Sequence, residues 1–286
     1  MLIFRRICAL LIVLAATALS GTPLPTMALG QGEGPDRDTF IRKVREAVRR
    51  DYELQSQFSY IEERREVKIS RLGKVDVGSV RTFEVFPAPE PGGTYKRLIA
   101  VDGRPLSPEE LARRDREHQE HMAEIAEREK KDTPGDRAKR LRRMREEAAD
   151  RDAILEDALA VFDPTFESRE VIDGELVFAI ALRPRHDARP TTRPGRWMKK
   201  FAGRVWIAED GHQIVKLDLR AIDDVTIGMG IVGRLHEGSR VVYSRRHFED
   251  TWLPSELIFD ATGRTLLFRP FDIDIVTTYS DYKRIQ

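Results

Sequence analysis

The sequence predicts an α+β protein made mainly of antiparallel strands, with an N-terminal helix and an inserted pair of charged helices. Three observations predict this class. Apolar residues first recur with the period of a helix, and after residue 57 the period changes to that of a strand. Turn signals then separate the later strands at roughly ten-residue spacing, as in an antiparallel sheet or open barrel. Between these parts, residues 105–162 are dominated by Glu, Arg and Lys.

The first thirty residues have the pattern of a secretory signal peptide. Arg5 and Arg6 precede an apolar run over residues 7–19, and small residues then lead to Gly30. We expect cleavage after Gly30, with Ser20 as a second candidate position. The apolar run is shorter than the roughly 20 residues that a membrane-spanning helix needs. The pattern therefore predicts export to the periplasm and a mature domain over residues 31–286, with uncleaved anchoring as the less favoured alternative.

Composition excludes several classes of function. The only cysteine, Cys8, lies in the predicted signal peptide, so the mature protein has no thiol for catalysis, zinc binding or redox switching. The full chain has 49 basic and 48 acidic residues, and loss of Arg5 and Arg6 leaves the net charge near zero. A nucleic-acid partner would require a basic excess, so none is expected.

The N-terminal part predicts a helix followed by a meander of strands. Residues 36–51 form an amphipathic pattern, and strands are predicted over residues 58–70, 79–87 and 94–101. A turn over residues 73–78 separates the first two strands, and Asp102-Gly103 ends the third. The apolar stripe of the helix consists of Phe40, Val44, Ala47 and Val48.

Two helices are predicted within residues 105–162, joined by a turn at residues 133–136. Ser107 is placed to cap the first helix, with Pro108 at its first position and Glu110 three residues beyond Ser107. Apolar residues are sparse until the end of the second helix. We therefore expect a solvated helical excursion whose last turns return to the sheet, where apolar residues condense at Ile154, Leu155, Ala158, Leu159 and Phe162.

The remaining chain predicts a series of strands. Within residues 176–182 both faces are apolar, so this strand must be covered on both sides, with a helix on one side and a cavity as one option for the other. The predicted strands span residues 165–172, 175–183, 203–208, 213–221, 240–248, 253–259 and 266–282.

Two short motifs suggest ligand sites but have stronger structural explanations. Residues 228–233 match the G-x-G-x-x-G pattern, yet no helix of adequate length follows, so a bent strand corner or an apolar loop is the better interpretation. His118 and His121 lie one helical turn apart, but no third ligand is identifiable and their surroundings are charged. No metal and no cofactor are therefore expected.

Catalytic patterns are missing from the sequence. The nucleophile pattern G-x-S-x-G does not occur, and the acidic pairs lack a His or Lys nearby in the sequence. Those pairs are Asp223-Asp224 and Asp272 with Asp274. Because carboxylates from distant strands could still converge, an enzyme is disfavoured rather than excluded.

A basic loop over residues 183–204 is broken by prolines and carries one acid, Asp187. Trp197, Met198 and Phe201 lie close by in the sequence. Basic residues beside apolar ones suit the headgroup and tail of an anionic amphiphile, although a solvated connection between strands also explains them. The candidate headgroup residues are Arg189, Arg193, Arg196, Lys199 and Lys200.

Three stretches in order resemble a known family. They are residues 204–218 (RVWIAEDGHQIVKLD), residues 251–254 (TWLP) and residues 278–283 (TYSDYK). This order is similar to that in outer-membrane lipoprotein-sorting proteins of the LolA/LolB-type fold. The resemblance covers residues 200–286, and more weakly the helix and strands from residue 36. It implies a curved, open half-barrel sheet around an apolar cavity with helices as a lid, which carries acyl chains across the periplasm. The charged helical pair is longer than the lid helices of that family, and the lipidation cysteine of its LolB branch is absent.

The function expected from these features is a periplasmic carrier of lipid or lipoprotein acyl chains, acting as a monomer. The alternative is a regulatory or protein-interaction module on the same scaffold, bound to an inner- or outer-membrane envelope protein through its charged helices. Individually, each candidate cavity residue is also explained as ordinary core. The candidates are Phe83, Val85, Phe178, Ile180, Trp206, Leu217, Leu219, Phe259 and Phe271.

Overall fold

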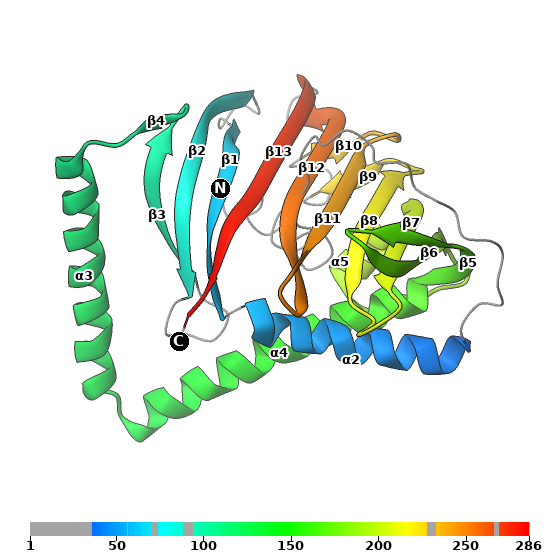
Figure 1. Ribbon diagram of the computed structural model, residues 1–286, viewed down its shortest axis with the longest axis horizontal. Helices are drawn as coiled ribbons and strands as arrows, with labels where there is room; N and C mark the ends of the chain where they lie inside the picture. The colour runs from blue at the N-terminus through cyan, green and yellow to red at the C-terminus, as the bar shows by residue number, and fades with distance from the viewer. Residues whose placement is uncertain are drawn as a thin grey trace.

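The computed structural model describes residues 36–55, 57–69, 74–87, 94–227, 233–265 and 269–285. The predicted signal peptide, residues 1–30, lies outside the described residues. The fold class is confirmed, because antiparallel strands form one open sheet and helices accompany it (Figure 1).

The N-terminal part follows the predicted order closely. Helix α2 (Arg37–Gln55) precedes strands β1 (Phe58–Ile69), β2 (Val75–Pro87) and β3 (Thr94–Val101). Strand β2 begins earlier than predicted, because Gly78 lies inside it instead of in the turn. A two-residue strand, β4 (Arg104–Pro105), was not predicted and pairs with β3.

Two long helices occupy the charged region, as predicted. Helix α3 (Pro108–Lys130) begins where Ser107 accepts a hydrogen bond from the backbone N–H of Glu110, at 3.2 Å. Helix α4 (Pro134–Val161) begins with a capping box in which the Thr133 hydroxyl and the Asp136 carboxylate each accept from the other residue's backbone N–H. Figure 1 shows α3 standing beside the β3 end of the sheet, while α4 runs toward the other end.

The second half of the chain contains the remaining strands. A short helix, α5 (Arg193–Met198), interrupts the loop predicted over residues 183–204, because Thr192 caps it and Pro194 suits its first turn. Strand β12 extends further than predicted, and two short strands, β9 and β10, flank residues 228–232, which are not described. The strands are β5 (Phe162–Ile172), β6 (Glu175–Pro184), β7 (Phe201–Ala208), β8 (Ile214–Ala221), β9 (Val225–Ile227), β10 (Gly233–Leu235), β11 (Arg240–Phe248), β12 (Thr251–Thr265) and β13 (Arg269–Arg284).

The strand order places β1, the first strand of the chain, beside β13, the last one. The order is β4-β3-β2-β1-β13-β12-β11-β8-β7-β6-β5, with β10 also paired to β12 and β9 to β10. Strand β1 pairs with β13, with Phe58 opposite Arg284. The sheet stays open, because β4 and β5 form its two ends and do not pair with each other.

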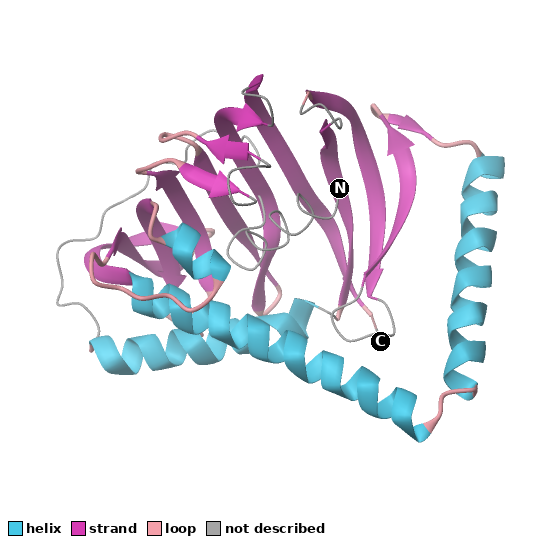
Figure 2. Cartoon of the chain, turned by 180° about the vertical axis from the view of Figure 1, so that it is seen from behind, coloured by secondary structure: helices cyan, strands magenta, loops and turns pink. Residues whose placement is uncertain are grey.

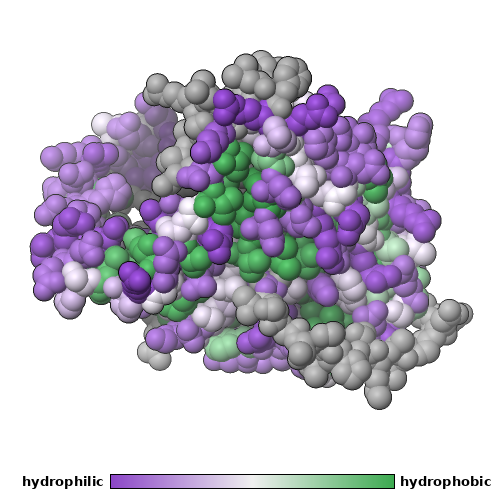
Figure 3. All heavy atoms as spheres, turned by 90° about the horizontal axis from the view of Figure 1, so that it is seen from above, coloured by the Kyte–Doolittle hydropathy of each residue, from purple (hydrophilic) through white to green (hydrophobic). Residues whose placement is uncertain are grey.

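The main core lies where α2 packs against the sheet. It joins apolar side chains of α2 with those of β6 to β12, for example Phe40 with Leu217 and Phe259. Figure 2 shows α2, α4 and α5 on this side of the second half of the sheet. Viewed from above, hydrophobic residues gather in the middle of the molecule inside a hydrophilic surround (Figure 3). Among the described residues no helix is long and apolar enough to cross a membrane.

A candidate apolar ligand cavity

A cavity of about 360 Å³ lies between helices α2 and α4 and the strands β5 to β8. Its volume falls within the roughly 300–1,000 Å³ typical of small-molecule sites. Apolar side chains dominate its wall. The lining residues are Phe40, Ile41, Val44, Val48, Arg49, Ala148, Arg151, Asp152, Ile154, Leu155, Ala158, Leu159, Phe162, Pro164, Ile180, Leu182, Val205, Ile207, Ile214, Leu217 and Leu219.

Helix α2 reaches the cavity with its apolar stripe. Phe40 and Val44 are each 7% exposed, and the Phe40 ring meets the Phe178 ring edge-on with 5.6 Å between centroids. Helix α4 contributes its last turns, where Ile154 and Val161 are buried. The sparse apolar residues of the long charged region thus condense where α4 returns to the sheet, as predicted.

Ion pairs join α2 to α4 beside the cavity. The Arg45 guanidinium donates to both oxygens of the Glu156 carboxylate, at 2.7 and 3.0 Å. Arg49 donates to Asp152 at 3.0 Å, and both of these residues also line the cavity. These pairs are partly solvent-exposed, so each contributes about 0–1 kcal/mol to stability. The cavity therefore has an apolar interior and a charged edge.

The structure brings together some of the predicted cavity residues. Ile180, Leu217 and Leu219 line the cavity. Phe178 and Phe259 belong to the same buried cluster, and Phe271 packs against it, but these three are not among the lining residues.

Other predicted cavity residues lie elsewhere. Phe83 and Val85 form a separate cluster with Leu98 on β2 and β3. Trp206 belongs to a further cluster, and its indole N–H donates to Glu170 at 2.8 Å. Strand order and strand face decide these positions, and neither can be taken from the apolar pattern alone.

Strand β6 is covered on both sides, but the helices and the cavity share one side. Phe178 and Ile180 join the core beneath α2, whereas Val177 and Ala179 pack with Trp206 in the other cluster. The expectation that a helix and a cavity would cover opposite faces was therefore wrong. Bulky side chains, including Trp252 of β12, cover the second face instead.

Helix residues that line the cavity were predicted only as packing surfaces. Val44 and Val48 of α2, and Leu155 and Ala158 of α4, were interpreted as stripes facing the sheet. The signal in the sequence was an apolar stripe on each of the two helices. A stripe on a helix does not reveal whether the space beneath it is filled.

A strap formed by residues 185–200 is fixed to the end of α4 by one buried carboxylate. Asp157 is 5% exposed and accepts hydrogen bonds from the backbone N–H groups of Thr191 and Thr192, at 2.9 and 2.7 Å. Both threonine hydroxyls also donate to it. Burial alone would raise the pKa of Asp157, but these hydrogen bonds hold it below its ordinary value. A Cβ at Gly195 would lie 2.3 Å from Asp157 Oδ2, so the strap needs glycine at this position.

The candidate headgroup residues divide into two groups. The Lys199 amine donates to the carbonyls of His186 and Ala188, and the Lys200 amine pairs with Asp223 at 2.8 Å. Lys199 therefore closes the strap on itself, and Lys200 ties it to the loop between β8 and β9. The exposed side chains that remain are Arg189, Arg193 and Arg196.

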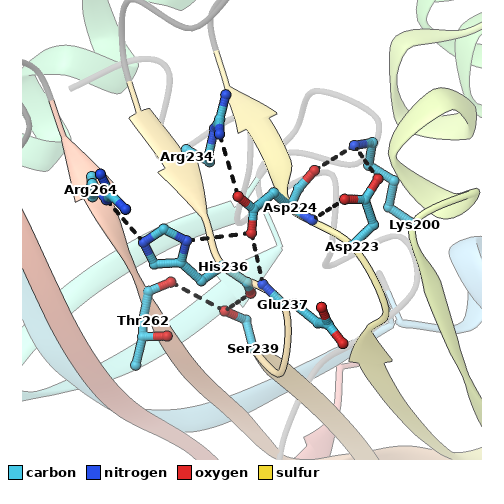
Figure 4. A network of polar contacts seen from close by, with 9 residues as sticks. All are labelled: Lys200, Asp223, Asp224, Arg234, His236, Glu237, Ser239, Thr262 and Arg264. Atoms are coloured by element: carbon cyan, nitrogen blue, oxygen red, sulfur yellow. Dashed lines mark hydrogen bonds and ion pairs between the residues drawn. The ribbon is translucent and has the colours of Figure 1, made fainter.

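A polar network beside the strap combines carboxylate, imidazole and hydroxyl groups, which are the groups that a catalytic triad uses (Figure 4). Asp224 accepts from the backbone N–H of Glu237 at 3.0 Å and lies 3.3 Å from Nδ1 of His236. Nε2 of His236 is 3.4 Å from Nε of Arg264, and the Ser239 hydroxyl donates to carbonyl oxygens. Because Ser239 does not face the imidazole, the network lacks the nucleophile–base contact of a catalytic triad. It fastens the β9–β10 hairpin to β12.

Of the remaining sequence motifs, the structure describes the two histidines and the last glycine, whereas residues 228–232 lie outside the described residues. His118 stacks on Tyr95 with 3.4 Å between ring centroids, and His121 is exposed. No cluster of three or more potential metal ligands occurs within the described ranges. Gly233 of the glycine pattern begins strand β10, so a strand and not a helix follows that pattern.

No protein family model and no curated protein matches the sequence. Two solved structures are similar to the chain, each covering 87% of it and 93% of its own chain at 10% identity. One is a LolA superfamily protein from Nitrosomonas europaea, with a TM-score of 0.26. The other, from Vibrio parahaemolyticus, is a domain provisionally named an outer membrane lipoprotein-sorting protein, with a TM-score of 0.27.

Proposed function

We propose that the protein reversibly binds the apolar tail of a lipid or an acylated lipoprotein in the cavity between α2, α4 and strands β5 to β8. The observation that carries this proposal is an apolar volume of about 360 Å³ beneath two helices. The apolar interior of the cavity offers water few hydrogen-bond partners, so a hydrocarbon is its natural occupant. Each buried methylene group contributes about 0.8 kcal/mol to binding before the costs of association.

The proposal includes the place and manner of action. The signal-peptide pattern of residues 1–30 supports export to the periplasm. Binding requires no covalent chemistry and no cofactor, and the protein acts as a monomeric carrier rather than as an enzyme. The charged edge formed by Arg49 and Asp152 supports an arrangement in which the polar end of the ligand stays near solvent.

Filling the cavity tests the proposal. Ala158 lines the cavity, whereas Ala160 is exposed on the same helix. We expect Ala158→Trp to weaken uptake of a fluorescent fatty acid at least about 10-fold, because a ring replaces the space for the tail. Ala160→Trp is the matched control and should bind like the unsubstituted protein. Val48→Trp fills the same cavity from α2 and guards against a folding defect specific to Ala158.

Native mass spectrometry identifies the ligand itself. Protein purified from a bacterial periplasm without detergent should carry phospholipid or acylated peptide, and both cavity-filling variants should lose it. A ligand-free protein that also takes up no fatty acid would contradict the proposal.

A second candidate function is supported by the exposure of α3. No described side chain of α3 is buried, and α4 has buried residues only from Ile154 onward. A helix pair with so little packing can bind an envelope protein in the manner of an interaction module. Capture of a specific partner by the full chain, lost on charge reversal along α3 but not on Ala158→Trp, would favour this function over the carrier.

A further inference from the structure

We propose that three arginines on the strap form a docking surface for membranes rich in anionic phospholipid. This arginine surface consists of Arg189, Arg193 and Arg196. Each is exposed, and they lie within one short segment that contains helix α5. The inference is independent of the cavity, since it depends only on surface charge and geometry.

The arginine surface lacks acidic partners, unlike many arginines of this protein. Arg45, Arg97 and Arg240 donate to carboxylates within 3.0 Å. In the part of the chain that the structure describes, no carboxylate pairs with an arginine of the surface. The guanidinium of Arg196 donates to the Thr191 carbonyl, which leaves its charge uncompensated.

Three acids around the strap already have partners. Asp157 is caged by Thr191 and Thr192 beneath the strap. Asp223 accepts from Lys200, and Asp224 faces Arg234 and His236 in the network of Figure 4. Positive charge therefore dominates the outer side of the strap, apart from the exposed Asp187.

The strap holds the arginine surface in place. Four donors of two threonines fix it to Asp157, and the Lys199 amine closes it by binding two of its carbonyls. A surface fixed in this way loses little conformational entropy when it meets phosphate groups. Guanidinium groups also bind phosphate oxygens in a bidentate geometry, which favours phospholipid headgroups as partners.

An aromatic residue beside the arginines suits the membrane interface. The Arg193 guanidinium lies over the Trp197 ring at 5.2 Å from its centroid, and the indole N–H donates to the Thr226 carbonyl. Tryptophan and arginine together are typical of surfaces that settle at headgroup level. The next residue, Met198, packs in a cluster with Leu182, which also lines the cavity. Docking through the strap would therefore bring one end of the cavity close to the bilayer.

Vesicle co-sedimentation tests the docking surface. The full chain is mixed with vesicles of phosphatidylcholine alone or with added phosphatidylglycerol, at low and at high salt. We expect binding only to the anionic vesicles, weakened by salt, and reduced roughly 10- to 100-fold in R189Q/R193Q/R196Q. The matched control, R137Q/R143Q/R145Q, removes the same charge from an exposed part of α4 and should retain binding within about two-fold.

Each outcome bears on the proposal. Equal binding to both vesicle types, no binding to either, or equal losses in the two triple variants would overturn it. If Arg196 proves necessary for folding, R189Q/R193Q keeps its contact with Thr191 and should still weaken binding at least about five-fold. Inorganic phosphate is then added as a competitor. Displacement of the protein from vesicles only at concentrations at which other salts also displace it supports a membrane-docking surface. Displacement at much lower phosphate concentrations would show a site for free phosphate and would overturn the proposal. Val48→Trp, which fills the cavity from α2 and lies outside the cluster that contains Met198, should leave vesicle binding unchanged. Failure of the carrier function is therefore distinguishable from failure of docking.

Discussion

The helices cover the two ends of the sheet with opposite chemistry. At the β5 end, α2 and α4 enclose about 360 Å³ with mainly apolar walls. At the β3 end, α3 encloses a hollow of about 380 Å³ whose walls mix charged and aromatic residues. There, Arg97 donates to both oxygens of Asp115, at 2.7 and 2.8 Å, and to Glu84 at 3.1 Å.

Volume alone therefore does not identify the ligand site. The α3 hollow is bounded by side chains that hydrogen-bond to one another and remain partly solvated, so a hydrocarbon would gain little there. The walls of the cavity at the β5 end are mainly apolar, and several of their side chains, such as Ile180 and Leu217, are buried. Removal of apolar area from water therefore provides the binding free energy there. The same difference predicts that α4 is anchored firmly at its C-terminal end, whereas α3 is held weakly.

The largest effect is expected from truncation inside the apolar end. Leu217 is 2% exposed, so Leu217→Ala should lower the free energy of unfolding by about 2–5 kcal/mol. Met122 is half-buried in the wall of the α3 hollow, and Met122→Ala should cost less than about 1 kcal/mol. Urea unfolding followed by circular dichroism measures both. Similar losses for the two variants would remove the proposed contrast between the ends.

A smaller loss is expected from the buried anchor of the strap. Asp157→Ala leaves the N–H groups of Thr191 and Thr192 without an acceptor, at a cost of about 2–3 kcal/mol. Because the pKa of Asp157 is lowered in the folded protein, its contribution to stability is present above its ordinary pKa of 3.8 and disappears as the pH falls through the folded value. Urea midpoints compared at pH 7 and in strong acid should thus differ more for the unsubstituted protein than for Asp157→Ala. An unchanged difference would show that Asp157 carries no charge in this anchor.

Local patterns in the sequence were sufficient for the elements but not for the site. Ser107 marks the start of α3, and Asp102-Gly103 marks the turn after β3, because caps and turns depend on a few neighbouring residues. The predicted turn at residues 133–136 is shorter in the structure, since Thr133 caps α4 and Pro134 already belongs to it. The apolar stripe of α2 was also evident. These features account for the agreement in fold class.

The cavity wall depended on information that local patterns do not contain. Phe83 of β2 and Ile180 of β6 are both apolar residues of predicted strands. In the sheet, β1, β13, β12, β11, β8 and β7 separate these two strands. Val205 and Trp206 are neighbours on β7, yet only Val205 lines the cavity. Strand order and the choice of face are set by long-range packing, so a single sequence left both open.

A buried carboxylate lies in the middle of the sheet, between the two ends. Glu256 of β12 is 4% exposed, and no described residue donates a hydrogen bond to its carboxylate. Burial raises its pKa to about 8. The folded pKa exceeds the ordinary value of 4.5. The contribution of Glu256 to the free energy of unfolding is therefore fully present below pH 4.5 and is lost as the pH rises through about 8.

Glu256→Gln should therefore stabilise the protein at high pH. We expect a gain of about 1–2 kcal/mol at alkaline pH and little change in mild acid, because glutamine cannot ionise. Thermal unfolding across this pH range measures the gain. A gain of the same size in mild acid would assign the effect to packing instead of ionisation.

The smallest effect is expected at the contact between α3 and the sheet. Arg97 and Asp115 have side chains 26% and 38% exposed, so solvent screens their attraction. Hydrogen bonds from Arg97 nevertheless lower the pKa of Asp115, which shows that the two groups interact. A double-mutant cycle with Arg97→Gln and Asp115→Asn should give a coupling energy smaller than each of the effects above. Amide hydrogen exchange should then become faster in α3 but not in the last turns of α4, where buried apolar side chains provide the anchor. Faster exchange in both helices would mean that they open together, and α3 would then be part of the cover over the cavity instead of an independent arm.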